Sequence, residues 1–161
     1  MIVIVMGVVG AGKTTVGQLL AEQLGWDFAD ADDFHPPSNV EKIRRGIGLT
    51  DADREPWLDR LRNAILGWIA AKRNVVLACS ALKGSYREKL RAGPEVKFVY
   101  LKGSEELIAQ RLSSRHGHFA NEGILASQMA DLEEPEGALT VEITGAPEQI
   151  VGEIRKALGL E

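Results

Sequence analysis

Residues 7–14 read Gly-Val-Val-Gly-Ala-Gly-Lys-Thr and fit the phosphate-binding pattern G-x-x-x-x-G-K-[ST]. The glycines let the backbone come close to a ligand, so that loop N–H groups can converge on phosphate oxygens. Lys13 supplies a cation for the β- and γ-phosphates, and the Thr14 hydroxyl is suited to Mg²⁺. We therefore predict binding of a nucleoside triphosphate with Mg²⁺, with nucleotide contacts from Gly7, Val8, Val9, Gly10, Ala11, Gly12, Lys13, Thr14 and Thr15.

The acidic run Asp30–Asp33 is the second group that could do chemistry. Phosphoryl transfer needs a carboxylate that orients the acceptor hydroxyl and takes its proton. On an extended chain Asp30 and Asp32 share a face, so one could serve the metal and the other the hydroxyl. We predict that Asp30 joins Thr14 at the metal and that Asp32 is the base. The alternative is a solvated acidic turn.

These groups need a scaffold, and apolar runs alternate with amphipathic runs along the chain. The predicted strands are residues 2–6, 26–31, 74–79, 97–101 and 139–143. The predicted helices are residues 14–24, 54–72, 86–91, 104–114, 123–132 and 148–158. This alternation favours an α/β fold, a three-layer αβα sandwich around a five-stranded parallel sheet. In such sheets ligands bind beyond the carboxyl ends of the strands.

Composition narrows the function classes. The chain has 161 residues, of which 45% are hydrophobic and 26% charged, and its net charge is -4. We expect one domain over residues 1–161, with no nucleic-acid partner and no membrane partner. The single cysteine, Cys79, lies in an apolar run and predicts a buried, inert thiol. This cysteine usage is compatible with the cytoplasm, which we take as the expected location.

Longer motifs follow the loop. Residues 32–42 read D-D-x-H-P-x-x-N-x-x-K, and residues 49–58 read L-T-D-x-D-R-x-P-W-L. Residues 79–91 read C-S-A-L-K-x-x-Y-R-x-x-L-R, and residues 117–119 read Gly-His-Phe. Together and in this order, the motifs resemble the gluconate kinase family of small P-loop sugar-acid kinases. The match covers nearly the whole chain.

The resemblance implies a P-loop NTPase fold like that of shikimate and nucleoside-monophosphate kinases. It implies a substrate-binding insertion at about residues 34–72 and a lid at about residues 111–128. The implied reaction is ATP-dependent phosphorylation of D-gluconate to 6-phosphogluconate, and the implied assembly is a homodimer.

A sugar acid presents a carboxylate and several hydroxyls, so its site should offer a guanidinium and mixed polar groups. Arg54 opposes the dipole where its predicted helix begins, which favours a role in the site over a surface ion pair with Asp51 or Asp53. Lys83 and Arg87 share a helical face that either belongs to the site or is solvated. The predicted substrate contacts are Asp32, His35, Lys42, Arg54, Lys83, Arg87 and His118.

Arg111 and Arg115 are four residues apart on the helix that enters the predicted lid. The resemblance places lid arginines over ATP, where one that closes on the γ-phosphate neutralises developing charge while the lid excludes water. We predict both as nucleotide contacts, and Arg115 as catalytic with Lys13 and Asp32.

Two departures from the family pattern fall in the lid. Residues 120–121 are Ala-Asn where the family usually has Met-Pro, and Ser114 stands where it often has a second arginine. Two other functions stay open. A shikimate or nucleoside-monophosphate kinase would share the architecture but does not need the His-Pro and Asp-Arg-x-Pro-Trp runs. The other is a non-catalytic, nucleotide-dependent switch with no small-molecule acceptor. A guanine-specific switch would usually show N-K-x-D and D-x-x-G, and this sequence contains neither.

Overall fold

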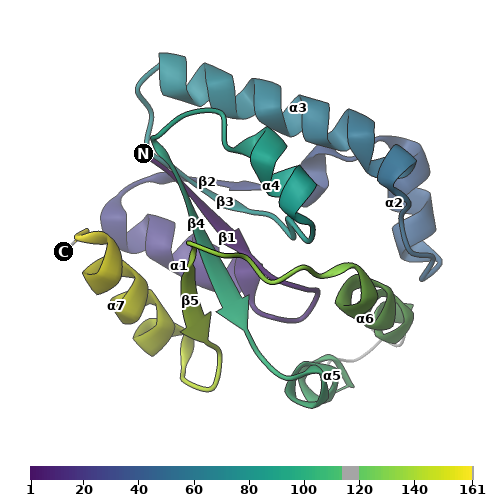
Figure 1. Cartoon of the computed structure of the whole chain (residues 1–161). Coiled ribbons are helices and arrows are strands. Elements are labelled where there is room, and N and C mark those ends of the chain that lie inside the picture. The colour runs from purple at the N-terminus through teal and green to yellow at the C-terminus, as the bar shows by residue number, and fades with distance from the viewer. Residues whose placement is uncertain (114–119, 161) are drawn as a thin grey trace.

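The computed structural model describes residues 1–113 and 120–160, with the backbone alone at residues 120–122. Within these residues, five parallel strands form a sheet in the order β2-β3-β1-β4-β5 (Figure 1). The strands are β1 (Ile2–Met6), β2 (Asp27–Asp30), β3 (Val75–Ala78), β4 (Val96–Lys102) and β5 (Leu139–Glu142). The predicted α/β fold with a five-stranded parallel sheet is confirmed.

Helices cover both faces of the sheet (Figure 1). One face carries α1 (Lys13–Leu24) and α7 (Pro147–Leu158), and the other carries α3 (Asp51–Ala70) and α4 (Gly84–Leu90). The remaining helical segments are η1 (Ala31–Phe34), α2 (Pro37–Arg44), α5 (Glu105–Ser113) and α6 (Ala120–Asp131). In the described part of the chain, no helix combines the length and apolarity that crossing a membrane requires.

The central strand β1 explains why the sheet is covered twice. All five of its residues are buried. Val3 and Val5 belong to the core under α1 and α7, whereas Ile2, Ile4 and Met6 belong to the core under α3. Successive side chains point to opposite faces, so an all-apolar strand is stable only between two layers. Each such side chain contributes roughly 1.5–3 kcal/mol of transfer free energy.

Helix α3 begins at Asp51, three residues before the predicted start. The Thr50 hydroxyl accepts the Asp53 N–H at 3.1 Å, and the Asp53 carboxylate accepts the Thr50 N–H at 2.9 Å. This reciprocal cap satisfies two backbone donors that a helix start leaves free. Arg54 therefore lies within the first turn, and the acidic residues before it complement the helix dipole.

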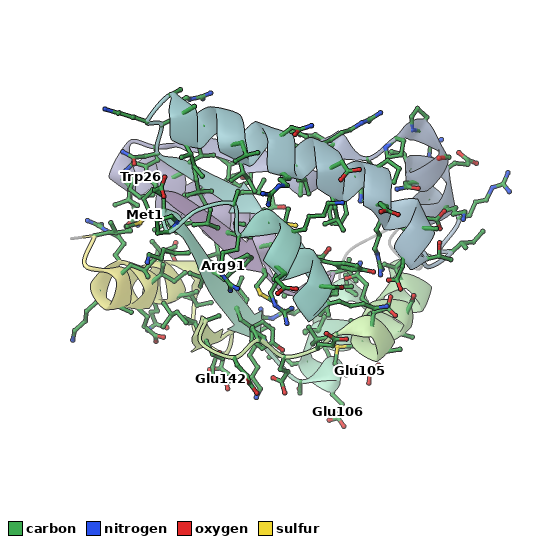
Figure 2. The ribbon with its side chains drawn as sticks, turned by 45° about the horizontal axis from the view of Figure 1, so that its top comes forward. Met1, Trp26, Arg91, Glu105, Glu106 and Glu142 are labelled. Carbon is green, nitrogen blue, oxygen red and sulfur yellow. The ribbon has the colours of Figure 1, made fainter. Side chains whose placement is uncertain are left out.

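The residues that follow β1, β2 and β3 meet at the carboxyl edge of the sheet, where the predicted chemistry belongs. They are the phosphate loop at residues 7–12, the acidic run that starts at Asp30, and Cys79 with Ser80. Cys79 is buried as predicted, and burial raises the pKa of its thiol to about 12. Figure 2 shows Met1 and Trp26 at the opposite edge, away from the loop.

Candidate functional site

The phosphate loop joins β1 to α1 in the predicted order of strand, loop and helix. Gly10 and Gly12 have left-handed backbone, with φ of 83° and 97°. A Cβ on Gly10 would lie 2.9 Å from Leu112 Cγ, so the loop packs against α5 only because this residue has no side chain. Lys13 Nζ donates to the Val8 carbonyl at 3.0 Å, which holds the ammonium against the loop.

The acidic run turns toward this loop. Thr14 Oγ1 donates to Asp30 Oδ2 at 3.2 Å, and the Asp32 N–H donates to Asp30 Oδ1 at 2.9 Å. The second bond caps η1, so the chain turns after Asp30 and does not continue extended as predicted. The Asp30 carboxylate is therefore occupied by these two donors, whereas the Asp32 side chain faces a cavity.

Asp32 and Lys13 perturb each other. Burial, with help from the Asp30 charge, raises the pKa of the Asp32 carboxyl, and Lys13 opposes that change. Burial lowers the pKa of the Lys13 ammonium, and the Asp32 charge opposes that change in turn. A carboxylate with a raised pKa is a better proton acceptor than an ordinary one, which suits Asp32 to a general base.

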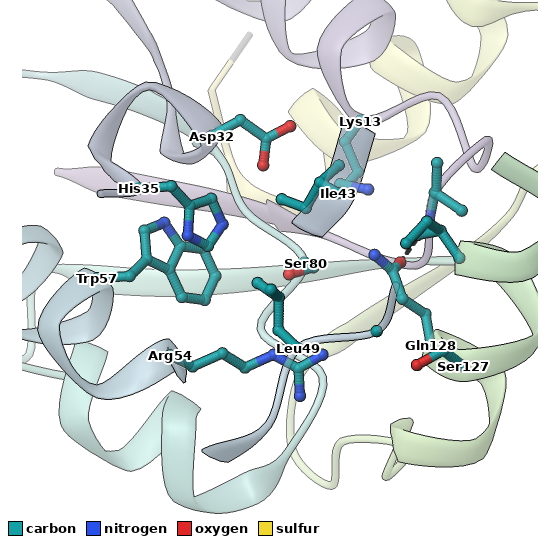
Figure 3. Close-up of a pocket in the computed structure, with 13 residues that line it drawn as sticks. Lys13, Asp32, His35, Ile43, Leu49, Arg54, Trp57, Ser80, Ser127 and Gln128 are labelled. Carbon is teal, nitrogen blue, oxygen red and sulfur yellow. Dashed lines mark hydrogen bonds between the residues drawn. The ribbon is translucent and has the colours of Figure 1, made fainter. Parts of the chain in front are cut away.

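The cavity has a volume of about 100 Å³ and opens beside the phosphate loop, between η1, α3 and α6 (Figure 3). Its apolar walls include Ile43, Leu49 and Trp57, and its charged, imidazole and amide groups are Lys13, Asp32, His35, Arg54 and Gln128.

The cavity is one of three adjoining hollows. Val9, Lys13 and Asp32 also line a hollow of about 170 Å³ above the phosphate loop, here called the loop hollow. The loop hollow in turn shares Gly10, Gly12 and Thr15 with a hollow of about 210 Å³ beside Arg111 and Pro147, here called the outer hollow. Cavity, loop hollow and outer hollow therefore follow one another along the loop.

Arg54 is a predicted substrate contact that reaches the cavity. Its side chain is only 6% exposed, and its Nη1 donates to Asp131 Oδ2 at 2.9 Å and to the Tyr86 hydroxyl at 3.0 Å. The Tyr86 hydroxyl donates to Asp51. Arg54 Nε and Nη2 donate to no residue that the structure describes, so one edge of the guanidinium is left for a ligand. The alternative of a surface ion pair with Asp51 or Asp53 is wrong.

His35 lies flat against Trp57, with ring centroids 4.3 Å apart and planes 12° from parallel. Asn39 Nδ2 donates to the Asp53 carbonyl at 2.7 Å and lies 3.1 Å from His35 Nδ1. An amide nitrogen cannot accept, so His35 Nδ1 must be the unprotonated ring nitrogen, and Nε2 carries the proton. Burial, assisted by the Arg54 charge, lowers the pKa of His35 to about 4, so the ring is neutral at pH 7.

Helix α6 forms the wall of the cavity next to the phosphate loop. Gln128 Oε1 accepts the Val9 N–H of the loop at 2.7 Å. A Cβ on Gly48 would lie 2.1 Å from Ser127 Oγ, so the chain before α3 comes this close to α6 because residue 48 is glycine. Ser127 and Gln128 both line the cavity, and neither was predicted as a site residue.

Sequence reasoning missed other members of the site as well. Trp57 was not predicted as a site residue, and Tyr86 and Asp131 were not considered as partners of Arg54. The helix over residues 123–132 was predicted, but its part in the site was not. The signal for that part is the three-residue spacing of Gln128 and Asp131, which places both on one face of the helix.

Two predicted substrate contacts lie outside the cavity lining. Lys42 Nζ pairs with Asp53 at 2.8 Å, and Lys83 Nζ pairs with Asp51 at 2.9 Å. The Lys42 bond is the main reason that the pKa of Asp53 falls to about 2. Both lysines hold neighbouring helices against the start of α3 in this structure, and their role as substrate contacts stays a prediction.

Arg87, a third predicted substrate contact, also lies outside the cavity lining. It is 6% exposed, and its guanidinium donates to the carbonyls of Ala81 at 2.7 Å, Leu82 at 3.1 Å and Glu133 at 2.9 Å. Ala81 has φ of 46°, a left-handed conformation that is unfavourable for a residue with a Cβ. Arg87 therefore stabilises the strained loop after β3.

Two predicted lid residues, Arg115 and His118, lie outside the described residues. Arg111 lies on α5, donates to the Ile143 carbonyl and lines the outer hollow. This placement agrees with a nucleotide contact, because the outer hollow continues from the phosphate loop.

Comparisons with known proteins give a consistent picture. A family model described as shikimate kinase matches residues 9–144. A gluconokinase of Gluconobacter oxydans (strain 621H) is 49% identical over 82% of this chain and 75% of its own length. A solved sugar kinase from Janibacter sp. HTCC2649 is 41% identical with a TM-score of 0.93, covering 99% of this chain and 94% of that one. A solved gluconokinase from Sinorhizobium meliloti 1021 is 41% identical with a TM-score of 0.88, covering 98% and 90%.

Proposed function

Because this chain belongs to the gluconokinase family, we propose that it transfers the γ-phosphoryl group of ATP to a hydroxyl of D-gluconate, forming 6-phosphogluconate. The observation that carries this proposal is the row of three hollows. A nucleotide lying along the phosphate loop would direct its terminal phosphate toward the cavity, whose wall the loop hollow shares through Val9, Lys13 and Asp32.

The donor half consists of the phosphate loop and the outer hollow. The Val9 and Ala11 N–H groups donate to Gln128 and Val8, so the other backbone N–H groups of residues 7–15 and the N-terminus of α1 bind the polyphosphate, and Lys13 balances charge near the γ-phosphate. The nucleoside occupies the outer hollow beside Arg111 and Pro147. Arg115, on the predicted lid at about residues 111–128, adds a second cation to the phosphates.

Thr14 and Asp30 are the residues that would hold Mg²⁺. A hydroxyl and a carboxylate whose oxygens are 3.2 Å apart fit the preference of this ion for oxygen ligands, with substrate phosphates and water completing the set. When bound, the ion would neutralise charge on the phosphates and help to align them. Asp30 suits this task better than Asp32, because its carboxylate already faces the Thr14 hydroxyl.

The acceptor half lies in the cavity, between the insertion at about residues 34–72 and α6. The free edge of the Arg54 guanidinium binds the sugar-acid carboxylate, a geometry that allows two parallel hydrogen bonds. The neutral His35 ring donates from Nε2 to a hydroxyl, and Asp32 accepts a hydrogen bond from the hydroxyl that reacts. Predicted contacts from His118 would come from the lid.

The reaction asks for little covalent chemistry from the protein. The acceptor oxygen forms a bond to the γ-phosphorus, the bond from that phosphorus to the β–γ bridging oxygen breaks, and ADP leaves. The hydroxyl proton passes to Asp32, whose raised pKa favours this acceptance. Positioning of the two substrates and neutralisation of the phosphoryl charge by Lys13 supply most of the rate enhancement.

The test is an assay of ADP release from Mg-ATP with a panel of acceptors: D-gluconate, its epimers, shikimate and nucleoside monophosphates. Shikimate belongs in the panel because a shikimate kinase model matches the chain. We expect ADP release that depends on D-gluconate, with 6-phosphogluconate as the product by ³¹P NMR. Preference for another acceptor, or hydrolysis that needs no acceptor, would contradict the proposal.

A further inference from the structure

Gln128 reaches from α6 to the phosphate loop, and its amide can adopt one orientation only. The Val9 N–H lies 2.7 Å from the Gln128 side-chain oxygen. A backbone N–H is a donor, so the amide atom that faces it must be the acceptor Oε1. The other end of the amide, Nε2 with its two N–H groups, is then directed away from the loop.

That second end points into the cavity. Figure 3 shows the Gln128 amide with its nitrogen toward the interior and its oxygen toward the loop. Nε2 donates to no residue that the structure describes. The Gln128 side chain lines the cavity together with Asp32 and Arg54, which stand across from it. The cavity therefore holds a fixed pair of neutral donors at its boundary with the phosphate loop.

The charged groups of the cavity have other tasks under the proposed function, on which this inference rests. Asp32 accepts a hydrogen bond from the reacting hydroxyl, Lys13 neutralises charge on the phosphates, and Arg54 binds the sugar-acid carboxylate. A neutral donor is suited to a hydroxyl that stays unreacted. We propose that Gln128 determines acceptor specificity, holding the Val9 N–H through Oε1 and donating through Nε2 to one non-reacting hydroxyl of the sugar acid.

This arrangement gives Gln128 two contacts at the place where donor and acceptor meet. Val9 lines both the cavity and the loop hollow, so the residue that orients the acceptor also fixes the loop beside the γ-phosphate. A site built to hydrogen-bond a hydroxyl rejects an acceptor that lacks or inverts it, because the donor is then left without a partner. Gln128 would therefore select among sugar acids that differ at one carbon.

The experiment compares wild type, Gln128→Met and the control Gln18→Met. Methionine keeps a similar length and shape but removes both hydrogen bonds, and Gln18 is an exposed glutamine of α1 away from the cavity. Each protein is assayed with D-gluconate, its epimers and its monodeoxy derivatives, and ADP affinity is measured without acceptor. If Gln128→Met does not fold, Gln128→Glu replaces it, because a carboxylate oxygen still accepts the Val9 N–H.

We expect wild type and Gln18→Met to disfavour one altered acceptor at least about tenfold, and the Gln128 variant to lose that discrimination. For D-gluconate, kcat/KM of the Gln128 variant should fall about 100-fold. An equal loss for every acceptor would assign Gln128 to the loop alone and overturn the inference, as would kcat/KM within threefold of wild type. If wild type itself does not phosphorylate gluconate, the proposed function fails and the inference fails with it.

Discussion

The two halves of the site are built in different ways. The phosphate-binding part of the donor half comes from one continuous stretch, residues 7–15, and most of its predicted contacts are backbone N–H groups. The acceptor half comes from segments far apart in sequence, with Asp32, Arg54, Ser80 and Gln128 meeting in one cavity. The first half depends on a local loop conformation, and the second depends on the whole fold.

The difference shows how the protein can combine a common reaction with a particular acceptor. A polyphosphate is recognised by any loop of this conformation, so its cradle needs few specific side chains. A sugar acid needs a cation at a defined distance from a base, and that distance is set by long-range contacts. The bond from Arg54 to Asp131 spans 77 positions in the sequence, and it fixes α3 against α6.

Asp32→Asn should affect both halves of the site, because Asp32 lines both the cavity and the loop hollow. The side chain keeps its shape but cannot take the proton, so we expect kcat to fall about 10²–10⁴-fold with a normal fold. Turnover by coupled ADP assay and the thermal midpoint are the measurements. A variant with nearly wild-type kcat would remove Asp32 from the mechanism.

Arg54→Lys tests the acceptor half alone. Lysine keeps the charge but loses the planar fork, so kcat/KM for gluconate should fall about 10–100-fold while ADP affinity changes little. Lys83→Met is the matched control, since Lys83 pairs with Asp51 outside the cavity lining, and its kcat/KM should stay within about twofold. Equal losses in the two variants would mean that Lys83, too, contacts the acceptor.

Arg87→Met separates a structural cation from a binding cation. Three carbonyls lose their donor and a strained loop loses its support, so the free energy of unfolding should fall by about 2–4 kcal/mol. Gluconate KM at a temperature where the variant is folded should stay close to wild type. Denaturant unfolding gives the free energy of unfolding, and steady-state kinetics give the gluconate KM. A large rise in KM with unchanged stability would show that Arg87 contacts the substrate.

The smallest expected effect is the pH response of His35. Its pKa of about 4 in the folded protein lies below the ordinary 6.5, so folding disfavours its protonation. The stability that the neutral ring provides is complete above about pH 6.5 and is lost as the pH falls toward 4. An NMR titration of the ring gives the pKa directly, and a midpoint near 6.5 would show that burial and the Arg54 charge do not disfavour protonation of the ring.

Local patterns were enough for the sheet and for the order of strand, loop and helix around the phosphate loop. Short apolar runs such as residues 2–6, followed by glycines, are typical of buried strands. Helix α2 was missed because residues 37–44 are mostly polar and carry no apolar stripe, although Pro37 marks a favourable first position.

The partners of the buried arginines could not be predicted from local sequence patterns. Arg87 was predicted as a substrate contact because it shares a helical face with Lys83. In the structure its guanidinium donates to the carbonyl of Ala81, and no sequence pattern predicts the left-handed conformation of Ala81. Arg54 was predicted as a substrate contact and lines the cavity, whereas its partners Tyr86 and Asp131 are known only once α4 and α6 are placed. A charge in a sequence predicts a partner but does not say which one.

The most direct test of the central claim is a crystal structure of the protein with a non-hydrolysable ATP analogue, Mg²⁺ and D-gluconate. We predict gluconate in the cavity, with its carboxylate on Arg54 and one hydroxyl oxygen within hydrogen-bond distance of Asp32, facing the γ-phosphate. Gluconate bound outside the cavity, or with its carboxylate on Lys83 or Arg87, would contradict the account.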